Sequence, residues 1–217
     1  MVNFANAQSR GKFYPNLVRF LKETKAADQP LSLDRVERLN ELALFVEERR
    51  LRNEPIKIVF TCDSNARTSL MAEIWANAAA YYFQVEDVEF YSGGLSPGQV
   101  SHKALKSMER AGFIFYEFES VLGTRYQVNY GYDAEPLEIY AKKYSAKGNP
   151  TRGYCAALTC ASMIHLDPAL KGVLVKIALP YEDLAFIEGT EEVDQAYDQL
   201  NASMAREMFH FMQKIRK

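Results

Sequence analysis

IKIVFTCDSNARTSLMAEIWANAAA, residues 56–80, is the stretch that decides the fold class of this chain. Residues 56–61 are β-branched or aromatic except for Lys57, and this composition predicts a strand. Residues 69–80 are rich in alanine and carry larger apolar side chains at helical spacing, which predicts a helix with one buried face. A strand, a short polar loop and a helix in direct succession are typical of an α/β protein with a parallel sheet.

Strands and helices continue to alternate on the C-terminal side of this stretch. We expect strands at residues 88–92, 113–116, 154–159 and 173–179, and helices at residues 102–111 and 191–217. Residues 120–152 are rich in Tyr, Gly and Lys without a clear period, so we expect them to be irregular. This alternation predicts a three-layer α/β/α fold with a central parallel sheet covered by helices on both faces.

The N-terminal side of the stretch is expected to be helical. Pro15 can start a first helix, and Ser32 stands where an N-cap is favoured, before a second apolar stripe that begins at Leu33. We therefore predict a helical hairpin over residues 1–54, appended to an α/β domain over residues 55–217. A structural appendage is the simpler interpretation of this hairpin, and an oligomerisation or partner surface is the alternative.

Composition and charge limit the classes of function. The chain has 217 residues and a net charge of -2, so no overall basic field predicts binding to nucleic acid. No apolar run approaches the roughly 18 residues that a membrane span needs, and the polar N-terminus lacks the apolar centre of a signal peptide. We therefore expect a cytoplasmic protein that does not enter the membrane. Three cysteines without CxxC spacing and three scattered histidines give no reason to expect a metal site.

The loop that follows residues 56–61 has the residue types expected of an oxyanion site. Cys62 is expected at the carboxyl end of the first strand, where ligands of parallel α/β proteins gather. Backbone N–H groups at the start of the next helix can surround a tetrahedral anion, and with the helix dipole they favour a thiolate. The hydroxyl of Ser69 can donate a hydrogen bond to that sulfur. Such a thiolate can attack phosphorus or arsenic, although an inert buried thiol is the common alternative.

The segment VFTCDSNARTSLMAEIW, residues 59–75, resembles the nucleophile loop of low-molecular-weight protein tyrosine phosphatases and of the related thioredoxin-coupled arsenate reductases. In these families a strand is followed by C-x-x-N-x-x-R-S and by a helix that starts near M-A-E. Cys62, Asn65, Ser69 and the Met-Ala-Glu triplet fall in register with that pattern without a gap. The resemblance covers residues 56–217 and implies the same α/β/α fold.

Three further segments fit this resemblance in the expected order. Residues 91–94 resemble the second strand of the family, residues 158–160 the strand end that carries the second redox cysteine of the reductases, and residues 179–183 the segment with the general-acid aspartate. The resemblance therefore implies that Cys160 is a redox candidate. It also implies that Asp183 protonates the leaving oxygen.

The resemblance also implies a mechanism and a set of ligands. Cys62 attacks the phosphorus or arsenic atom, without a metal or an organic cofactor. The partners implied are phosphate, arsenate or a phosphorylated substrate, with a thioredoxin-type reductant if arsenate is reduced. The loop residues expected to hold the oxyanion are Asp63, Ser64, Asn65, Ala66, Arg67, Thr68 and Ser69.

The chain departs from the family pattern around the loop and at later positions. Thr68 stands where the family has the arginine that clamps the anion, and the loss of such a contact costs about 100-fold in rate. Arg67 is one position earlier, and we expect its side chain to point beside the loop. Asp63 repels an incoming anion, Asp167 replaces the resolving cysteine of the reductases, and Leu184 replaces the proline after the acid. The first hypothesis remains a cysteine-dependent phosphatase or arsenate reductase, and the second is an impaired member that binds a small anion or a protein partner.

Overall fold

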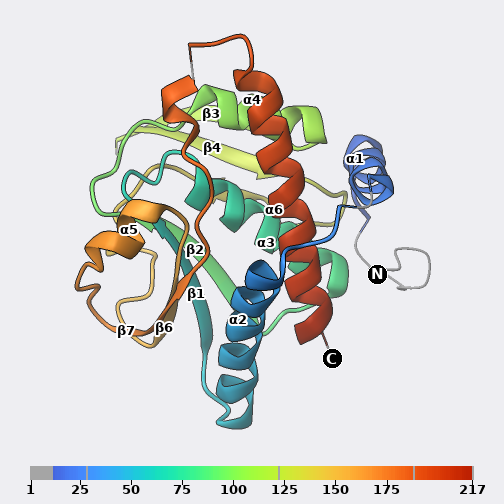
Figure 1. Cartoon of the computed structure of the whole chain (residues 1–217). Coiled ribbons are helices and arrows are strands. Elements are labelled where there is room, and N and C mark those ends of the chain that lie inside the picture. The colour runs from blue at the N-terminus through green and yellow to red at the C-terminus, as the bar shows by residue number, and fades with distance from the viewer. Residues whose placement is uncertain (1–11, 28, 122, 188, 217) are drawn as a thin grey trace.

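The centre of the molecule is a parallel sheet. The computed structural model describes residues 12–27, 29–121, 123–187 and 189–216. Four strands pair in parallel in the order β2-β1-β6-β7 (Figure 1). The central parallel sheet predicted from the sequence is therefore confirmed. The strands are β1 (Ile56–Cys62), β2 (Val88–Gly94), β6 (Tyr154–Leu158) and β7 (Val173–Ala178).

Helices lie on both faces of this sheet. Successive side chains of a strand point to opposite sides, so the apolar strands present apolar side chains on each face, and each face packs against helices. Ile58 joins the main core with α3 (Thr68–Phe83) and α6 (Val193–Ile215). Val59 points the other way and belongs to a smaller core that includes a methionine of α5 (Ala161–Leu166). The three-layer arrangement places the loop after β1 at the carboxyl edge of the sheet, with neighbouring strands on both sides.

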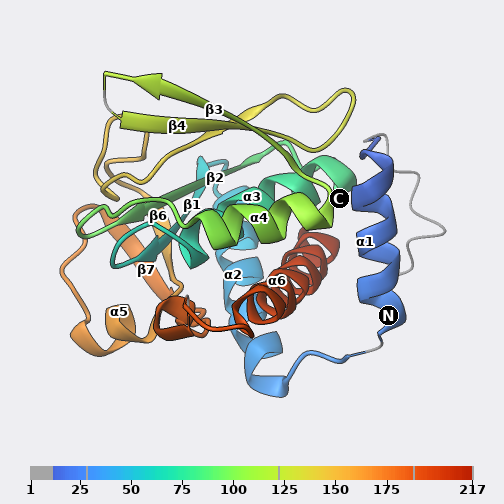
Figure 2. The same cartoon turned by 90° about the horizontal axis from the view of Figure 1, so that it is seen from above.

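A second, antiparallel sheet occupies part of the segment that the sequence predicted to be irregular. Its strands pair in the order β3-β4-β5 and lie above the parallel sheet in Figure 2. The prediction for residues 120–152 is thus wrong in part, and the strand expected at 113–116 belongs to this sheet and not to the parallel one. Tyrosines and charged residues on these strands obscure the alternation of apolar and polar side chains that is typical of a strand. Pairing with strands that are distant in sequence therefore determines that these residues form a sheet. The strands are β3 (Ile114–Ser120), β4 (Gly123–Asn129) and β5 (Leu137–Ile139).

Two helices form the N-terminal part, as the sequence predicted. They are α1 (Pro15–Ala26) and α2 (Leu33–Leu51), and the Ser32 hydroxyl caps α2 by accepting a hydrogen bond from the Arg35 N–H at 3.2 Å. The main contact of each helix is with α6, which lies between them in Figures 1 and 2. Leucines of both helices are buried in the main core. None of the described helices is long and apolar enough to cross a membrane.

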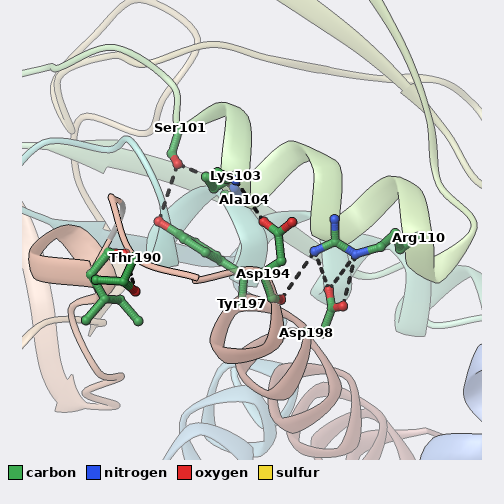
Figure 3. A network of polar contacts seen from close by, with 9 residues as sticks. Ser101, Lys103, Ala104, Arg110, Thr190, Asp194, Tyr197 and Asp198 are labelled. Atoms are coloured by element: carbon green, nitrogen blue, oxygen red, sulfur yellow. Dashed lines mark hydrogen bonds and ion pairs between the residues drawn. The ribbon is translucent and has the colours of Figure 1, made fainter. Parts of the chain in front are cut away.

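Ion pairs and a hydrogen bond fix α6 against α4 (His102–Ala111), as Figure 3 shows. Arg110 contacts the Asp198 carboxylate through two nitrogens at 2.7–3.0 Å. At the other end of α4 the hydroxyls of Ser101 and Tyr197 are 3.3 Å apart. The N–H of Ser101 in turn donates to the carbonyl of Ala66 at 2.9 Å. This network therefore links α6 to the loop that follows β1.

Candidate functional site

Cys62 ends β1 and is surrounded by its own loop. Its side chain is buried, and its Sγ lies 3.0 Å from the Ser69 Oγ and 3.1 Å from the backbone nitrogen of Asn65. The Ser69 oxygen also accepts a hydrogen bond from the Asn65 Nδ2 at 2.9 Å. Because that oxygen already accepts, the Ser69 hydroxyl proton can point at the sulfur. The Asn65 N–H therefore donates to the sulfur, and the Ser69 hydroxyl is placed to do the same.

The peptide groups of the loop have a common orientation. In a trans peptide the C=O and the N–H point in opposite directions. The Ser64 carbonyl accepts from the Gly98 N–H at 2.8 Å, and the N–H of the same peptide, that of Asn65, donates to the sulfur of Cys62. The carbonyls of Asp63 and Ala66 also accept hydrogen bonds from residues 96–101, at 2.9 Å each. Several N–H groups of the loop are thus directed away from that segment, toward the side where the sulfur lies.

Gly94 permits this close packing of the loop. A Cβ on Gly94 would lie 2.7 Å from the Asp63 carbonyl oxygen and 2.8 Å from the Asn65 nitrogen. Real Cβ atoms do not approach backbone atoms so closely, so any larger side chain here would displace the loop. Gly94, the last residue of β2, therefore allows the loop to adopt this shape.

A small pocket of about 80 Å³ lies at the sulfur. It brings together the loop after β1, the end of β6 and the segment after β7, which are far apart in sequence. Asp183 is one of its lining residues, and its Oδ1 accepts a hydrogen bond from the N–H of Ala185 at 3.0 Å. The lining residues are Cys62, Asp63, Ser64, Arg67, Thr68, Cys160, Tyr181 and Asp183.

Thr68 stands at the position of the clamping arginine in the resembled families. Hydrogen bonds connect its side chain to the central sheet. The Thr68 hydroxyl lies 3.1 Å from the Thr159 hydroxyl, which itself donates to the Thr61 carbonyl at 3.1 Å. Because the Thr159 hydroxyl proton is already donated to the Thr61 carbonyl, the Thr68 hydroxyl donates to the Thr159 hydroxyl oxygen. Thr68 and the half-buried Arg67 both line the pocket. That the Arg67 side chain points beside the loop stays a prediction.

Ser162 contacts both Asp63 and Cys160. The Ser162 hydroxyl donates to the Asp63 Oδ2, and it lies 3.2 Å from the Cys160 Sγ. Burial raises the pKa of the Cys160 thiol. Asp167, which stands in place of a resolving cysteine, forms an ion pair with the Lys176 Nζ at 2.6 Å and does not line the pocket.

Sequence reasoning missed a buried cluster behind the pocket. The Tyr181 hydroxyl donates to the Glu207 Oε2 at 2.6 Å, and the Glu207 Oε1 lies 3.2 Å from the Arg35 Nε. Arg35 also donates to the Pro180 carbonyl at 2.5 Å and stacks on the Tyr181 ring at 4.7 Å from its centroid. Burial raises the pKa of the Glu207 carboxyl, and Arg35 acts in the opposite direction. A glutamate inside the apolar stripe of α6 was the signal that could have indicated a buried partner.

Comparison with known proteins finds similarity to solved structures only; no family model and no curated protein sequence matches. An arsenate reductase in a phosphate-binding state is 15% identical, with 74% of this chain and 98% of that chain covered and a TM-score of 0.45. A low-molecular-weight phosphotyrosine phosphatase from Vibrio cholerae O395 is 15% identical, with 73% and 97% covered and a TM-score of 0.45. An arginine phosphatase from Geobacillus stearothermophilus is 15% identical, with 74% and 93% covered and a TM-score of 0.44. Likeness at this level says nothing of activity or substrate. The first two of these structures carry the names of the two groups whose loop motif this sequence resembles.

Proposed function

We propose that this chain is a phosphatase-like protein that uses Cys62 as a nucleophile in an oxyanion-binding loop. The supporting observation is the setting of the sulfur, which lies within hydrogen-bond distance of the Ser69 hydroxyl and the Asn65 N–H. It borders a pocket that also contains Asp183. A nucleophile, N–H donors and a carboxyl around one small space are the groups that phosphoryl transfer through cysteine needs.

In hydrolysis of a phosphate monoester, the Cys62 thiolate forms an S–P bond while the P–O bond to the leaving group breaks. Asp183 gives its proton to the leaving oxygen, and the loop N–H groups hold the other phosphate oxygens. Asp183 then takes a proton from water as the water attacks phosphorus. The S–P bond breaks, phosphate leaves, and the thiolate is regenerated.

Arsenate can enter the same loop. Cys62 forms an S–As bond with loss of water, and the Cys160 thiol then attacks the Cys62 sulfur. The electron pair of the broken S–As bond stays on arsenic, so arsenite leaves and a Cys62–Cys160 disulfide remains. A thioredoxin-type reductant returns both thiols. The presence of both cysteines in the pocket lining supports this branch.

Trapping of the covalent intermediate tests the proposal directly. The wild-type chain is mixed with an aryl phosphate, quenched rapidly under denaturing conditions and digested for mass spectrometry. We expect a phosphate on the peptide that contains Cys62, and none on the peptide of Cys155, which is buried in β6 and does not line the pocket. Turnover with the phosphate on another residue would exclude Cys62 as the nucleophile.

A second candidate function is binding of a small anion without turnover. Two observations favour the loss of turnover: the Thr68 side chain is held against Thr159, and Asp63 lines the pocket. A threonine cannot form the two parallel hydrogen bonds to an anion that arginine forms. Phosphate binding to the wild-type chain in the absence of any turnover would support this candidate.

Thr68→Arg separates the two candidates further. If the gapless register is right, the new guanidinium contacts the anion in the transition state, and we expect kcat/KM for an aryl phosphate to rise about 100-fold. Thr68→Lys is the matched control, because it adds the same charge without the planar fork and should give a smaller gain. Equal rates for wild type and Thr68→Arg would contradict the register.

A further inference from the structure

A second and larger cavity lies between the two sheets and shares no lining residue with the pocket at Cys62. Its volume is about 880 Å³, within the range of about 300–1,000 Å³ that is usual for small-molecule sites. Side chains of β2, α3, β4 and β5 line it, together with the segment that follows β5. We call it the lysine groove, after Lys142, Lys143 and Lys147 in its lining.

The lysine groove has a positive charge, whereas the whole chain has a negative net charge. The chain has a net charge of -2, yet the groove collects three lysines and Arg125. Of the two carboxylates in its lining, Glu138 is paired with Arg125. The other, that of Glu73, is buried and accepts a hydrogen bond from the Ser92 hydroxyl at 2.5 Å. Burial raises the pKa of Glu73, and the charge of Lys142 acts in the opposite direction. Within the described residues, none of the three lysines forms an ion pair with a carboxylate, so the groove carries uncompensated positive charge.

An aromatic ring and apolar walls accompany these cations. The Tyr140 ring lies 4.2 Å from the guanidinium carbon of Arg125 and 5.0 Å from the Lys142 Nζ, distances at which ring and cation attract each other. Phe90 and Leu137 add apolar surface to the lining. Walls of this kind favour a ligand with an organic body over a bare inorganic ion.

Hydrogen bonds to the end of β2 and to the Cys62 loop hold the main chain of the lysine groove. The Lys142 N–H donates to the Asn65 Oδ1 at 3.0 Å, and the Lys142 carbonyl accepts from the Gly94 N–H at 2.8 Å. The Tyr144 N–H donates to the Gly94 carbonyl at 2.9 Å. The segment that carries the lysines is therefore fixed before any ligand arrives, and this lowers the entropic cost of binding.

We propose that the lysine groove binds a small organic molecule with two or more phosphate or carboxylate groups. The three lysines hold the anionic groups, and the apolar walls contact the body of the molecule. An inorganic anion suits the small pocket at Cys62, whereas the lysine groove has the volume for a molecule of nucleotide size. This site does not depend on any chemistry at Cys62.

Isothermal titration calorimetry on the full chain tests this site. The probes are ATP, fructose 1,6-bisphosphate, citrate and inorganic phosphate, in about 0.15 M NaCl so that weak long-range attraction is screened. We expect at least one organic probe to bind with a Kd below about 100 µM. The double variant Lys143→Glu/Lys147→Glu should weaken that binding by about tenfold or more. Lys22→Glu/Lys106→Glu is the matched control, since it changes the net charge equally at exposed positions of α1 and α4 outside the groove and should bind as the wild type does.

The Lys143→Glu/Lys147→Glu variant also separates the groove from the Cys62 loop, because neither lysine lines the pocket at Cys62. A probe held at the Cys62 loop would bind to this variant as tightly as to the wild type. Binding that Lys143→Glu/Lys147→Glu leaves unchanged, or that both double variants weaken equally, would overturn the proposal. So would the absence of binding by every organic probe at about 1 mM. A poly-glutamate peptide is included, and its binding without that of any small probe would assign the groove to an acidic protein partner instead.

Discussion

Cys62→Ser is expected to lower the rate of aryl phosphate hydrolysis by at least about 10³-fold, because a serine hydroxyl does not ionise at neutral pH and cannot replace the thiolate as nucleophile. Serine is close in size to cysteine and can keep the hydrogen bonds to Ser69 and to the Asn65 N–H. The loop should therefore keep its shape and still bind phosphate. Steady-state kinetics give the rate, and titration with phosphate shows that the site is intact.

Cys155→Ala is the control for this experiment. Cys155 is fully buried in β6, and burial raises the pKa of its thiol, so it has no means to act as a thiolate. Removal of this thiol should leave the rate of hydrolysis close to that of the wild type. Hydrolysis at the same rate in wild type and Cys62→Ser would contradict the proposed function, and phosphate binding in both would then leave the anion-binding alternative.

Arg35→Leu is expected to reduce the free energy of unfolding by about 3–5 kcal/mol, because it leaves the Glu207 carboxylate buried without its cation. The side chain of Glu207 is only 3% exposed and that of Arg35 is 17% exposed, so water compensates little. Arg35 also anchors the Pro180 carbonyl and the Tyr181 ring beside the pocket. For a chain of this length the change corresponds to a fall in Tm of about 6–20 °C, measured by thermal unfolding.

Two further variants isolate the buried pair as the cause. Arg38→Leu removes a partly exposed arginine from the same helix, and surface pairs such as those of Arg38 with Asp34 and Glu41 contribute at most about 1 kcal/mol. The double variant Arg35→Leu/Glu207→Leu replaces both charges by apolar groups and should recover most of the lost stability. Equal losses in Arg35→Leu and Arg38→Leu would show that the buried pair does not have the stabilising role described here.

The roles of the two N-terminal helices also follow from this cluster. That α2 belongs to a hairpin appended to the α/β domain stays a prediction. Arg35 of α2 contacts Pro180 and Tyr181 beside the pocket and Glu207 of α6. Leucines of α1 and α2 are buried in the same core as β1 and α3. The N-terminal helices therefore contribute to the stability of the region around Cys62.

The sequence by itself determined the features whose causes lie within a few residues. The strand–loop–helix at residues 56–80 and the cap of α2 by Ser32 follow from local composition and short-range hydrogen bonds. The parallel sheet follows as well, because its apolar strands alternate with helices of clear period. For the same reason the position of the Cys62 loop between β1 and α3 could be predicted from the sequence.

Only the tertiary structure decided what depends on partners far away in the chain. The antiparallel sheet forms from strands whose mixed tyrosine and charged composition hides the alternation, so their pairing is set by the surfaces they pack against. The Arg35–Glu207–Tyr181 cluster and the Thr68–Thr159 hydrogen bond join residues 26 to 172 positions apart. A buried charge or hydroxyl is stable only beside its partner, and no local pattern in the sequence shows where that partner will lie.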